Sequence, residues 1–443
     1  MRAAPRLKLA AAALLALACA GCCLPAAAQT AAPPVVDDLL SIYAQARGAD
    51  PLLASAHALR GQQQELAVQA RAALLPQWTA SAGELRHGGG AREQQLGHSL
   101  SQVLLDLSRL RTLDAARTLL SAEDARVRAA ESELCARVAR AYFGVLSAQA
   151  TLGTAQQIEE AYAQQVQQAQ SRFEAQLSAA MDVEQARAYH ELSRGATAQA
   201  REALADARQA LAEITGQLPQ TLRPLAAELP AHAPEPAQPE AWVAQALRDN
   251  PSLQAQALGL SASEQRVAAA RAAHLPTLSL GWDGERRSGS AIAAQNAGRY
   301  DSTVALRLNI PLFAGGAIES QKRLAVHQQA LQRETLEAAR RALVRETQAQ
   351  HQAVLSALAQ LQSTRAAVDA AEKALLSTRS GLDLGARSMT DLLLAIQTRS
   401  NAHNAHAHAR HRYVLATLLL QQAAGQLGER ELAAVNQLLA SEL

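Results

Sequence analysis

The sequence predicts a mainly α-helical protein with two similar halves, each of which contains a short β-hairpin. Three observations predict this fold class. Two runs without proline, 107–218 and 312–443, are rich in Ala, Leu, Gln, Glu and Arg, which are strong helix formers. Short segments with a two-residue period interrupt the helical pattern. The same motifs also occur twice, in the same order, about two hundred residues apart.

The first 28 residues have the features of a signal peptide. Arg2, Arg6 and Lys8 precede the apolar run "LAAAALLALACAG", and small residues at 26–28 form a cleavage site before Gln29. The apolar run is too short for a stable transmembrane helix. We therefore expect a protein that is exported from a bacterial cytoplasm, with a mature chain beginning near residue 29.

Cysteine usage agrees with export but provides no disulfide. Cys19, Cys22 and Cys23 lie in the signal peptide, and whether one of them is lipidated stays open because the preceding residues match a lipobox poorly. Cys135 alone remains in the mature chain, so an internal disulfide is excluded. Its apolar helical surroundings predict a packed small side chain.

The internal repeat sets the domain organisation. "DPLLASAHAL" (50–59) matches "NPSLQAQALG" (250–259), and "ARAALLPQWTAS" (70–81) matches "ARAAHLPTLSLG" (270–281). "LSQVLLDLS" (100–108) aligns with "LNIPLFAGG" (308–316), and "FEAQLSAAMDVEQA" (173–186) aligns with "LDLGARSMTDLLLA" (382–395). These matches predict a first repeat at 29–218, a proline-rich connector at 219–240, a second repeat at 241–427 and a C-terminal segment at 428–443.

The proline-free runs predict unusually long helices. Apolar residues recur there at three- and four-residue steps, as in Leu134, Val138, Ala141 and Val145. A helix over 107–171 would be on the order of 100 Å long. Because that length exceeds any globular core, such helices must pack side by side, as a coiled coil or a barrel of helices.

Each half also carries a predicted hairpin, at about 77–105 and about 277–312. In the second half, Leu278, Leu280 and Trp282 alternate with polar or small residues after Pro276, and 304–310 alternate in the same way before Pro311. The loop expected between these strands is 285–299. In the first half, 77–86 and 96–105 show a weaker alternation.

The strand lengths suit a membrane-spanning β-barrel. Four strands cannot close such a barrel, and open edges are costly in lipid, so several chains would have to share one barrel. The alternative is a soluble coiled-coil protein with two surface hairpins.

Composition and motifs exclude other classes of function. A net charge of +2 and a pI near 8.4 show no nucleic-acid footprint. The sequence has no P-loop, no G-x-S-x-G and no H-E-x-x-H, so we expect neither an enzyme nor a bound cofactor.

The histidine-rich stretch "HNAHAHARH" is a weak metal candidate. On a helix, His403 and His406 share one side, while His408 and His411 share another, so four ligands do not converge. A solvated polar face is the preferred interpretation.

Taken together, several stretches resemble the outer-membrane efflux proteins, the TolC-like channel-tunnels, across nearly all of the mature sequence. They are "LSQVLLDLSRLR", "ARAYFGVLSAQ", "RFEAQLSAAMDVEQARA", "LAEITGQLP", "AARAAHLPTLSL", "LNIPLFAGGAIESQ" and "LGARSMTDLLLA". The similarity favours the type I secretion branch of the family.

The resemblance implies a homotrimer in the bacterial outer membrane, with a large periplasmic portion. Four strands per chain would build one twelve-stranded barrel in outer-membrane lipid. The helices would continue it as a tunnel, with the connector and C-terminal segment as an equatorial belt. Such a channel gives passive exit to substrates of an inner-membrane ABC transporter or proton-driven pump, through a periplasmic membrane-fusion adaptor.

The resemblance also assigns roles to residues in the two turns. Gly385 would ease a helical hairpin turn at the periplasmic tip, and Asp391 would form a constriction ring. Arg387 and Asp182 match a gate-linking pair.

The sequence departs from the family pattern at four positions. Gln176 replaces the usual glycine of the first turn, and Leu394 replaces a second acidic ring. Leu382 replaces a companion tyrosine, and Val103 replaces a proline. We therefore expect a single acidic ring and one fewer gate link.

The second function class that the sequence allows is a periplasmic coiled-coil adaptor, or a structural protein without a pore. Adaptors also contain long helical hairpins, but they usually add a β-rich domain and a membrane anchor. The duplicated order of helix, hairpin and helix argues against that class.

Overall fold

The computed structural model describes residues 36–290, 292 and 298–440. The predicted signal peptide, with Cys19, Cys22 and Cys23, lies outside the described residues. The chain divides into two units, Met1–Val36 and Asp37–Leu443. All of the helices and the four-stranded sheet belong to the second unit. No helix in the described ranges is both long and apolar enough to cross a membrane.

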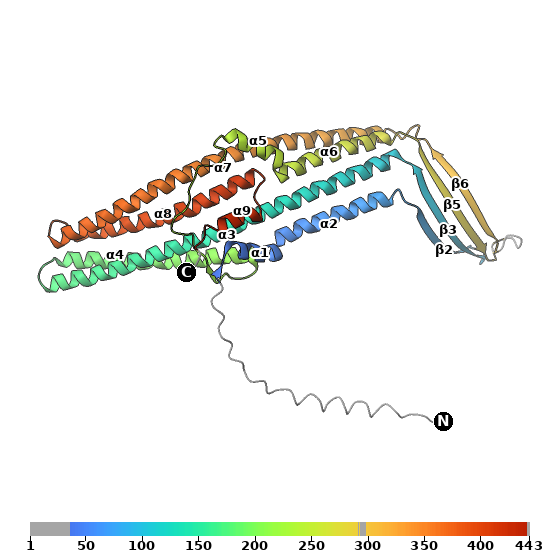
Figure 1. The fold of residues 1–443 in the computed structure, drawn as a ribbon. Coiled ribbons are helices and arrows are strands. Elements are labelled where there is room, and N and C mark those ends of the chain that lie inside the picture. The colour runs from blue at the N-terminus through green and yellow to red at the C-terminus, as the bar shows by residue number, and fades with distance from the viewer. Residues whose placement is uncertain (1–35, 291, 293–297, 441–443) are drawn as a thin grey trace, which may run out of the picture. The chain divides into compact units, whose positions relative to one another are not determined.

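Two long helical hairpins dominate the second unit (Figure 1). The first pairs α3 (Leu107–Glu174) with α4 (Ala180–Thr215), and the second pairs α7 (Ala317–Asp383) with α8 (Met389–Ala423). At 68 residues, α3 is about 100 Å long. It begins where the Asp106 carboxylate accepts a hydrogen bond from the backbone N–H of Arg109 at 3.0 Å. The predicted long helices and the internal duplication are confirmed.

A broken helix precedes each sheet hairpin. The pieces are α1 (Leu39–Ala49) and α2 (Pro51–Ala72) in the first half, and α5 (Pro239–Asp249) and α6 (Pro251–Ala272) in the second. The breaks arise because a proline disfavours the α conformation in the residue before it, while it suits the first turn of the following helix. Asp50 and Asn250 stand at these breaks and cap the helices that follow.

The two β-hairpins form one antiparallel sheet at one end of the long helices (Figure 1). Its strands are β2 (Gln77–Arg86), β3 (Arg92–Leu105), β5 (Thr277–Ser288) and β6 (Tyr300–Asn309), in the order β2-β3-β5-β6. The pairing of β3 with β5 joins the two halves. The four predicted strands are therefore confirmed, including those of the first half, where the alternation was weaker.

The strand boundaries differ from the predicted ones mainly where the connecting loops join the strands. β3 begins four residues before the expected start, and β5 continues to Ser288, into the expected loop. At the other end, β3 passes Val103 with a bulge and ends at Leu105, as predicted, while β6 stops at Asn309, before Pro311. Proline has no N–H for the ladder, and valine at the equivalent position keeps one, so only the first half extends its strand.

The connector and the C-terminal segment meet beside the middle of the long helices. The backbone N–H of Ala226 donates to the carbonyl of Leu438 at 2.9 Å, and that of Ala440 donates to Pro224 at 2.9 Å. The Tyr142 hydroxyl of α3 donates to the carbonyl of Arg223 at 2.7 Å. β4 (Thr221–Leu222) and α9 (Glu429–Asn436) lie in these two segments, and the two-residue β1 (Val36–Asp37) precedes α1.

The largest apolar core surrounds this middle region. Its fully buried side chains include Leu39, Ile42, Leu134, Val138, Tyr142, Phe143, Leu211, Leu418, Leu420 and Leu432. Cys135 is 1% exposed and belongs to the same core, so the prediction of a packed small side chain is confirmed.

Candidate functional site

The two hairpin turns have the same backbone structure. Gly385 adopts a left-handed φ of 73°, and Gln176 adopts 58° at the equivalent point of the first turn. The N–H of the next residue then closes each helix, from Ala386 to Gly381 O and from Leu177 to Arg172 O, both at 2.8 Å. Gln176 is the one non-glycine residue with positive φ in the described part of the chain. Gly385 thus lies where the turn requires a left-handed residue, and the first turn keeps that geometry without glycine.

Arg387 depends on a second glycine that the sequence analysis did not identify. A Cβ added to Gly381 would lie 2.7 Å from Cγ of Arg387, so the arginine stem passes directly over this glycine. Arg387 itself is exposed. The signal in the sequence was an isolated glycine one turn before Gly385, inside an otherwise glycine-poor helix.

Asp391 belongs to the capping box that starts α8. Its Oδ2 accepts hydrogen bonds from the Ser388 N–H at 3.0 Å and from the Ser388 hydroxyl at 2.9 Å, while Asp391 N–H donates to Ser388 Oγ at 3.1 Å. These bonds, with Arg387 nearby, hold the pKa of the Asp391 carboxyl below its ordinary value. The carboxylate is therefore oriented as well as ionised.

Asp182 lies at the equivalent position of α4 but has no such cap. The residue at the start of that helix is Ala179, which makes no side-chain hydrogen bond. Ion pairs near this turn join neighbours on one helix, as between Arg187 and Glu184 at 2.8 Å, and none joins Asp182 to Arg387 within the described residues. The predicted pair is therefore not formed inside one chain.

An apolar cluster holds the two turns together, and we call it the tip cluster. It contains Tyr162, Ala169, Val183, Ala186, Leu382, Met389, Leu392, Leu393 and Ile396. At the level of this cluster, hydrogen bonds join the two helical hairpins, from Tyr162 Oη to the Leu393 carbonyl at 3.3 Å and from Thr390 Oγ1 to Gln185 Oε1 at 2.9 Å. Leu382, which stands where the family often has tyrosine, is buried in the cluster, while Leu394 is 55% exposed.

The sheet at the opposite end has two chemically different faces. Residues directly opposite one another in a sheet share a face, so the register places Trp78, Leu100, Trp282 and Val304 in one row. Leu280 with Leu306, and Leu278 with Leu308, follow on the same face. We call this the apolar face. Its large side chains are exposed, with Trp78 at 73% and Val304 at 70%.

The other face, which we call the polar face, carries Thr, Ser, Gln and charged residues. Arg307 of β6 pairs with Asp283 of β5 at 3.1 Å, and Ser99 of β3 donates to the same carboxylate at 2.6 Å. Arg287 pairs with Glu285 at 2.7 Å. The two bonds to Asp283 link β3, β5 and β6, so the side chains of the polar face form a bonded network across three neighbouring strands.

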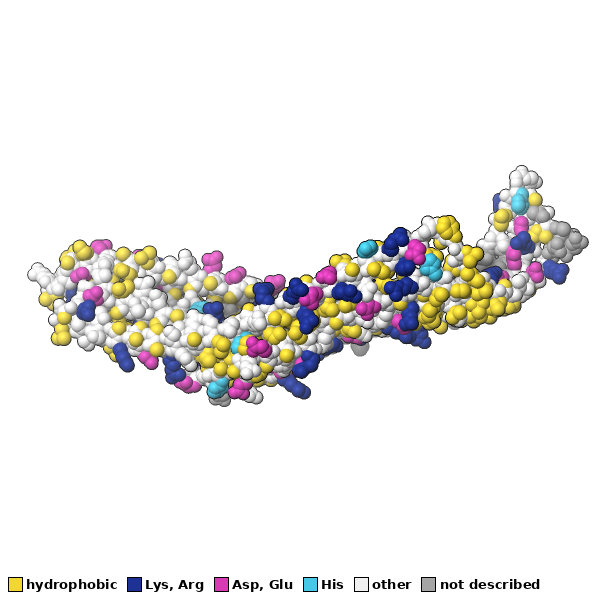
Figure 2. Space-filling view, turned by 90° about the horizontal axis from the view of Figure 1, so that it is seen from above, with side chains coloured by type: hydrophobic (Ala, Val, Ile, Leu, Met, Phe, Trp, Pro, Cys, Tyr) yellow, Lys and Arg dark blue, Asp and Glu magenta, His cyan; other side chains and the backbone are white. Residues whose placement is uncertain are grey.

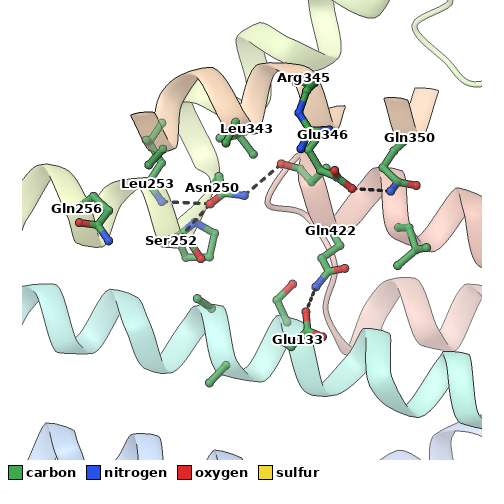
Figure 3. A pocket seen from close by; sticks show the side chains of 18 of the residues that line it. Glu133, Asn250, Ser252, Leu253, Gln256, Leu343, Arg345, Glu346, Gln350 and Gln422 are labelled. Carbon is green, nitrogen blue, oxygen red and sulfur yellow. Dashed lines mark hydrogen bonds between the residues drawn. The ribbon is translucent and has the colours of Figure 1, made fainter. Parts of the chain in front are cut away.

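A groove of about 790 Å³ lies between α3, α6, α7 and α8, near the middle of the unit (Figure 3). Gln422 donates to Glu133 at 2.5 Å, Gln350 donates to Glu346 at 2.6 Å, and Asn250 donates to the carbonyl of Ala423 at 3.2 Å. The lining residues include no histidine or cysteine. The polar groups that line the groove bond to one another and to the end of α8. The groove is therefore a packing interface between helices of both halves.

The four histidines of α8 face two different helices. His403 and His406 approach α7, with His403 Nε2 2.9 Å from Glu372 Oε1 and His406 Nδ1 3.1 Å from Thr364 Oγ1. His408 and His411 approach α3, at 2.9 Å from Thr151 and 2.9 Å from Ser147. Burial, with Arg410 nearby, lowers the pKa of His411 to about 4. The expected solvated face was therefore wrong for His411, because that ring packs between helices.

A match to a known family agrees with this geometry. The family described as "Outer membrane efflux protein" matches residues 42–217 and 242–426, which are the two halves without the connector. The chain belongs to this family. It is therefore an outer-membrane channel of the efflux and type I secretion kind, and the predicted fold class and location are confirmed.

Individual relatives support the assignment. The chain is 32% identical to the outer membrane protein TolC of Vibrio cholerae, over 90% of this chain and 93% of that protein. It is 29% identical to the alkaline protease secretion protein AprF of Pseudomonas aeruginosa, over 75% of this chain and 70% of the relative. The solved structure of the outer membrane protein VceC of Vibrio cholerae has the same fold, with a TM-score of 0.75, 20% identity, and coverage of 87% and 96%.

Proposed function

We propose that three copies of this chain form one passive exit channel, in which their sheets close a twelve-stranded barrel and their long helices continue it as a tunnel. The observation that carries the proposal is the sheet itself, which has an exposed apolar face, a polar face and two open edges, β2 and β6. Unpaired backbone groups are costly in lipid. Pairing of β6 with β2 of the next copy removes both edges.

The mature chain in this proposal begins near residue 29. The repeats 29–218 and 241–427 supply the wall, and 219–240 with 428–443 supply an equatorial belt. The contacts of Ala226 and Ala440 between connector and C-terminal segment support that belt. The channel carries out no chemistry on its cargo.

The partners in this proposal are a periplasmic membrane-fusion adaptor and an inner-membrane ABC transporter or proton-driven pump. Support comes from the relatives, one of which is named for alkaline protease secretion and another, of Brucella suis, for outer-membrane efflux. Because the channel wall is common to both kinds of export, the pump selects the cargo.

The gate in this proposal is at the turns. Three Asp391 carboxylates form a ring at the tip, and Arg387 contacts Asp182 of a neighbouring helical hairpin when the tip is closed. Arg387 is exposed and lies near Asp391 but forms no ion pair within the described part of its own chain, which supports a contact with a neighbour.

The test is reconstitution of the purified outer-membrane protein. We expect a species with about three times the mass of one chain before heating, and of one chain after heating, together with ion conductance in a planar bilayer. A monomer without conductance would contradict the proposal and would favour a pore-less coiled-coil protein.

A further inference from the structure

Charge is sorted between the two faces of the sheet, beyond what the barrel requires. Among the strand residues whose side chains lie on the apolar face, three are basic, Arg86, Arg92 and Arg286, and one is acidic, Glu84. Among the strand residues whose side chains lie on the polar face, the acids are Glu93, Asp283, Glu285 and Asp301, and the bases are Arg287 and Arg307. The apolar face thus has an excess of cations, and the polar face has an excess of anions.

The sorting divides neighbouring residues of opposite charge. Arg92 and Glu93 are adjacent on β3 and point to opposite faces, as do Glu285 and Arg286 on β5. Three of the four acids of the polar face have arginine partners. Arg287 lies 2.7 Å from Glu285 and 3.9 Å from Glu93, and Arg307 lies 3.1 Å from Asp283. Among the described residues, neither Arg92 nor Arg286 has a carboxylate within ion-pair distance. The excess positive charge therefore lies on the apolar side.

The arginines lie where the apolar side chains end. Leu308, near the helices, and Tyr300, opposite Arg286, are separated by about 27 Å along the strand, or about 20 Å of height once the strand is tilted. This is close to the height of the apolar band of a membrane barrel. Figure 2 shows hydrophobic side chains gathered where the strands adjoin the helices, and charged side chains beyond them. Arg286, and further out Arg92 and Arg86, thus stand at head-group depth.

A hollow of about 820 Å³ lies at the same level, lined by Leu96, His98, Arg286 and Tyr300 among others. His98 Nε2 lies 2.6 Å from Tyr300 Oη, and the His98 ring packs edge-on against Trp282 at 4.8 Å between centroids. Aromatic rings with a polar edge are typical of membrane–water interfaces. The hollow therefore combines an apolar floor, hydrogen-bonding rings and a guanidinium group.

We propose that this outward-facing rim, Arg86, Arg92 and Arg286 with His98 and Tyr300, binds the anionic, phosphate-bearing head groups of outer-leaflet lipid. The inference rests on the proposed barrel, because it takes the apolar face as the lipid side. The occupant follows from charge complementarity at head-group depth: a guanidinium binds phosphate by paired hydrogen bonds, and the apolar floor accepts the acyl chains. The acidic polar face remains toward the lumen.

The test uses the intact channel in vesicles of equal parts phosphatidylglycerol and phosphatidylcholine, followed by mass spectrometry of lipid that stays bound to the trimer. The native channel should retain about five times as much phosphatidylglycerol as phosphatidylcholine, or more. The double variant Arg92→Gln/Arg286→Gln should lose that preference. The matched control is Arg287→Gln, which removes the same charge from the adjacent residue on the polar face and should leave the preference unchanged.

Two further measurements separate the possible outcomes. Inorganic phosphate added in solution should not displace the bound lipid, and raised ionic strength should reduce the preference of the native channel, even if the double variant fails to fold. An unchanged preference in a conducting double variant, or an equal loss in Arg287→Gln, would overturn the lipid rim alone. A chain that forms neither trimer nor conductance would overturn the proposed function, and the rim with it.

Discussion

At the scale of single residues, Asp391 has a capping role that the structure shows and a ring role that we propose. Its carboxylate completes the cap of α8 through Ser388, and in the proposed tunnel it would also project negative charge inward. The exposed Leu394 one turn further on adds no second charge. One acidic ring, held in position by its own helix cap, is therefore the expected electrostatic feature of the tip.

Asp391→Asn should reduce the cation preference of the channel, roughly two- to fivefold, because three negative charges leave the narrowest point while a capping side chain remains. The measurement is the reversal potential under a salt gradient across a planar bilayer. Asp383→Asn, an exposed carboxylate just before the same turn, is the matched control and should change little. Unchanged ion selectivity in Asp391→Asn would contradict the proposed Asp391 ring.

Ser388→Ala should shift the pH dependence of that selectivity. Hydrogen bonds from the backbone N–H and from the hydroxyl of Ser388 lower the pKa of Asp391, and the substitution removes only the one from the hydroxyl. Part of the lowering is then lost, so the pKa rises and cation preference should be lost at a higher pH on acidification. Mutual repulsion in the ring also raises the pKa, in native and variant channels alike. The sign of the shift between them therefore reports the Ser388 contribution, and a shift to lower pH would contradict it.

Arg387→Ala should increase the conductance of the closed channel, because the proposed contact with Asp182 is lost in three copies. Each exposed pair contributes only about 0–1 kcal/mol, so partial opening is expected rather than a permanently open tip. Arg379→Ala removes an exposed arginine from α7, shortly before the turn that holds Arg387, and is the control. Equal closed-state conductance in the native channel and Arg387→Ala would leave Arg387 as ordinary helix-surface charge.

At the scale of elements, the two turns have the same backbone conformation but different residues at the left-handed position. Both reverse a hairpin through a left-handed residue and the same closing hydrogen bond, but Gln176 carries a side chain in a conformation that costs an L-residue about 1–2 kcal/mol. Gly385 avoids that cost. The first turn is therefore the more strained of the pair.

This difference predicts opposite effects of exchanging the residues. Gln176→Gly should raise the stability of the hairpin by up to about 1 kcal/mol, after the entropy lost by glycine is subtracted, while Gly385→Gln should lower it by about 1 kcal/mol. Thermal unfolding of the purified channel measures both. Changes of the same sign in the two variants would show that the turns are not equivalent.

The elements also show what could be predicted from the sequence. Helices followed from proline-free runs, and strands from alternation at Leu278–Trp282, because both periods are local properties of the chain. The cap of Asp391 also has a local signature, Ser388 three residues before an acid and an apolar run, which the sequence analysis did not use. The passage of Arg387 over Gly381 depends on side-chain placement after the turn has formed. The charge sorting needs the register of β3 with β5, which no single segment contains.

At the scale of the whole molecule, the sheet is incomplete in one chain. β2 and β6 each leave one row of backbone groups without a partner in the described sheet, beside exposed apolar side chains such as Trp78 and Val304. A head-to-tail contact between identical chains can form a closed ring. In the arrangement that we propose, three copies with four strands each make a ring of twelve strands.

The central claim is that β6 of one copy pairs with β2 of the next, and disulfide trapping tests it most directly. The two strands are separated in one chain by two others, so at about 4.8 Å per strand they lie on the order of 14 Å apart, beyond the reach of a disulfide. Native Cys135 should not interfere, because it is buried and burial raises its pKa to about 11.

Ser81→Cys on β2 is combined in turn with Thr303→Cys and Ala305→Cys on β6, oxidised in the membrane, and analysed on a denaturing gel. At the correct register we expect covalent dimers and trimers with nothing larger, while each single-cysteine variant forms no trimer. Cross-linking that stops at dimers, continues beyond trimers, or fails at every register would contradict the three-chain barrel.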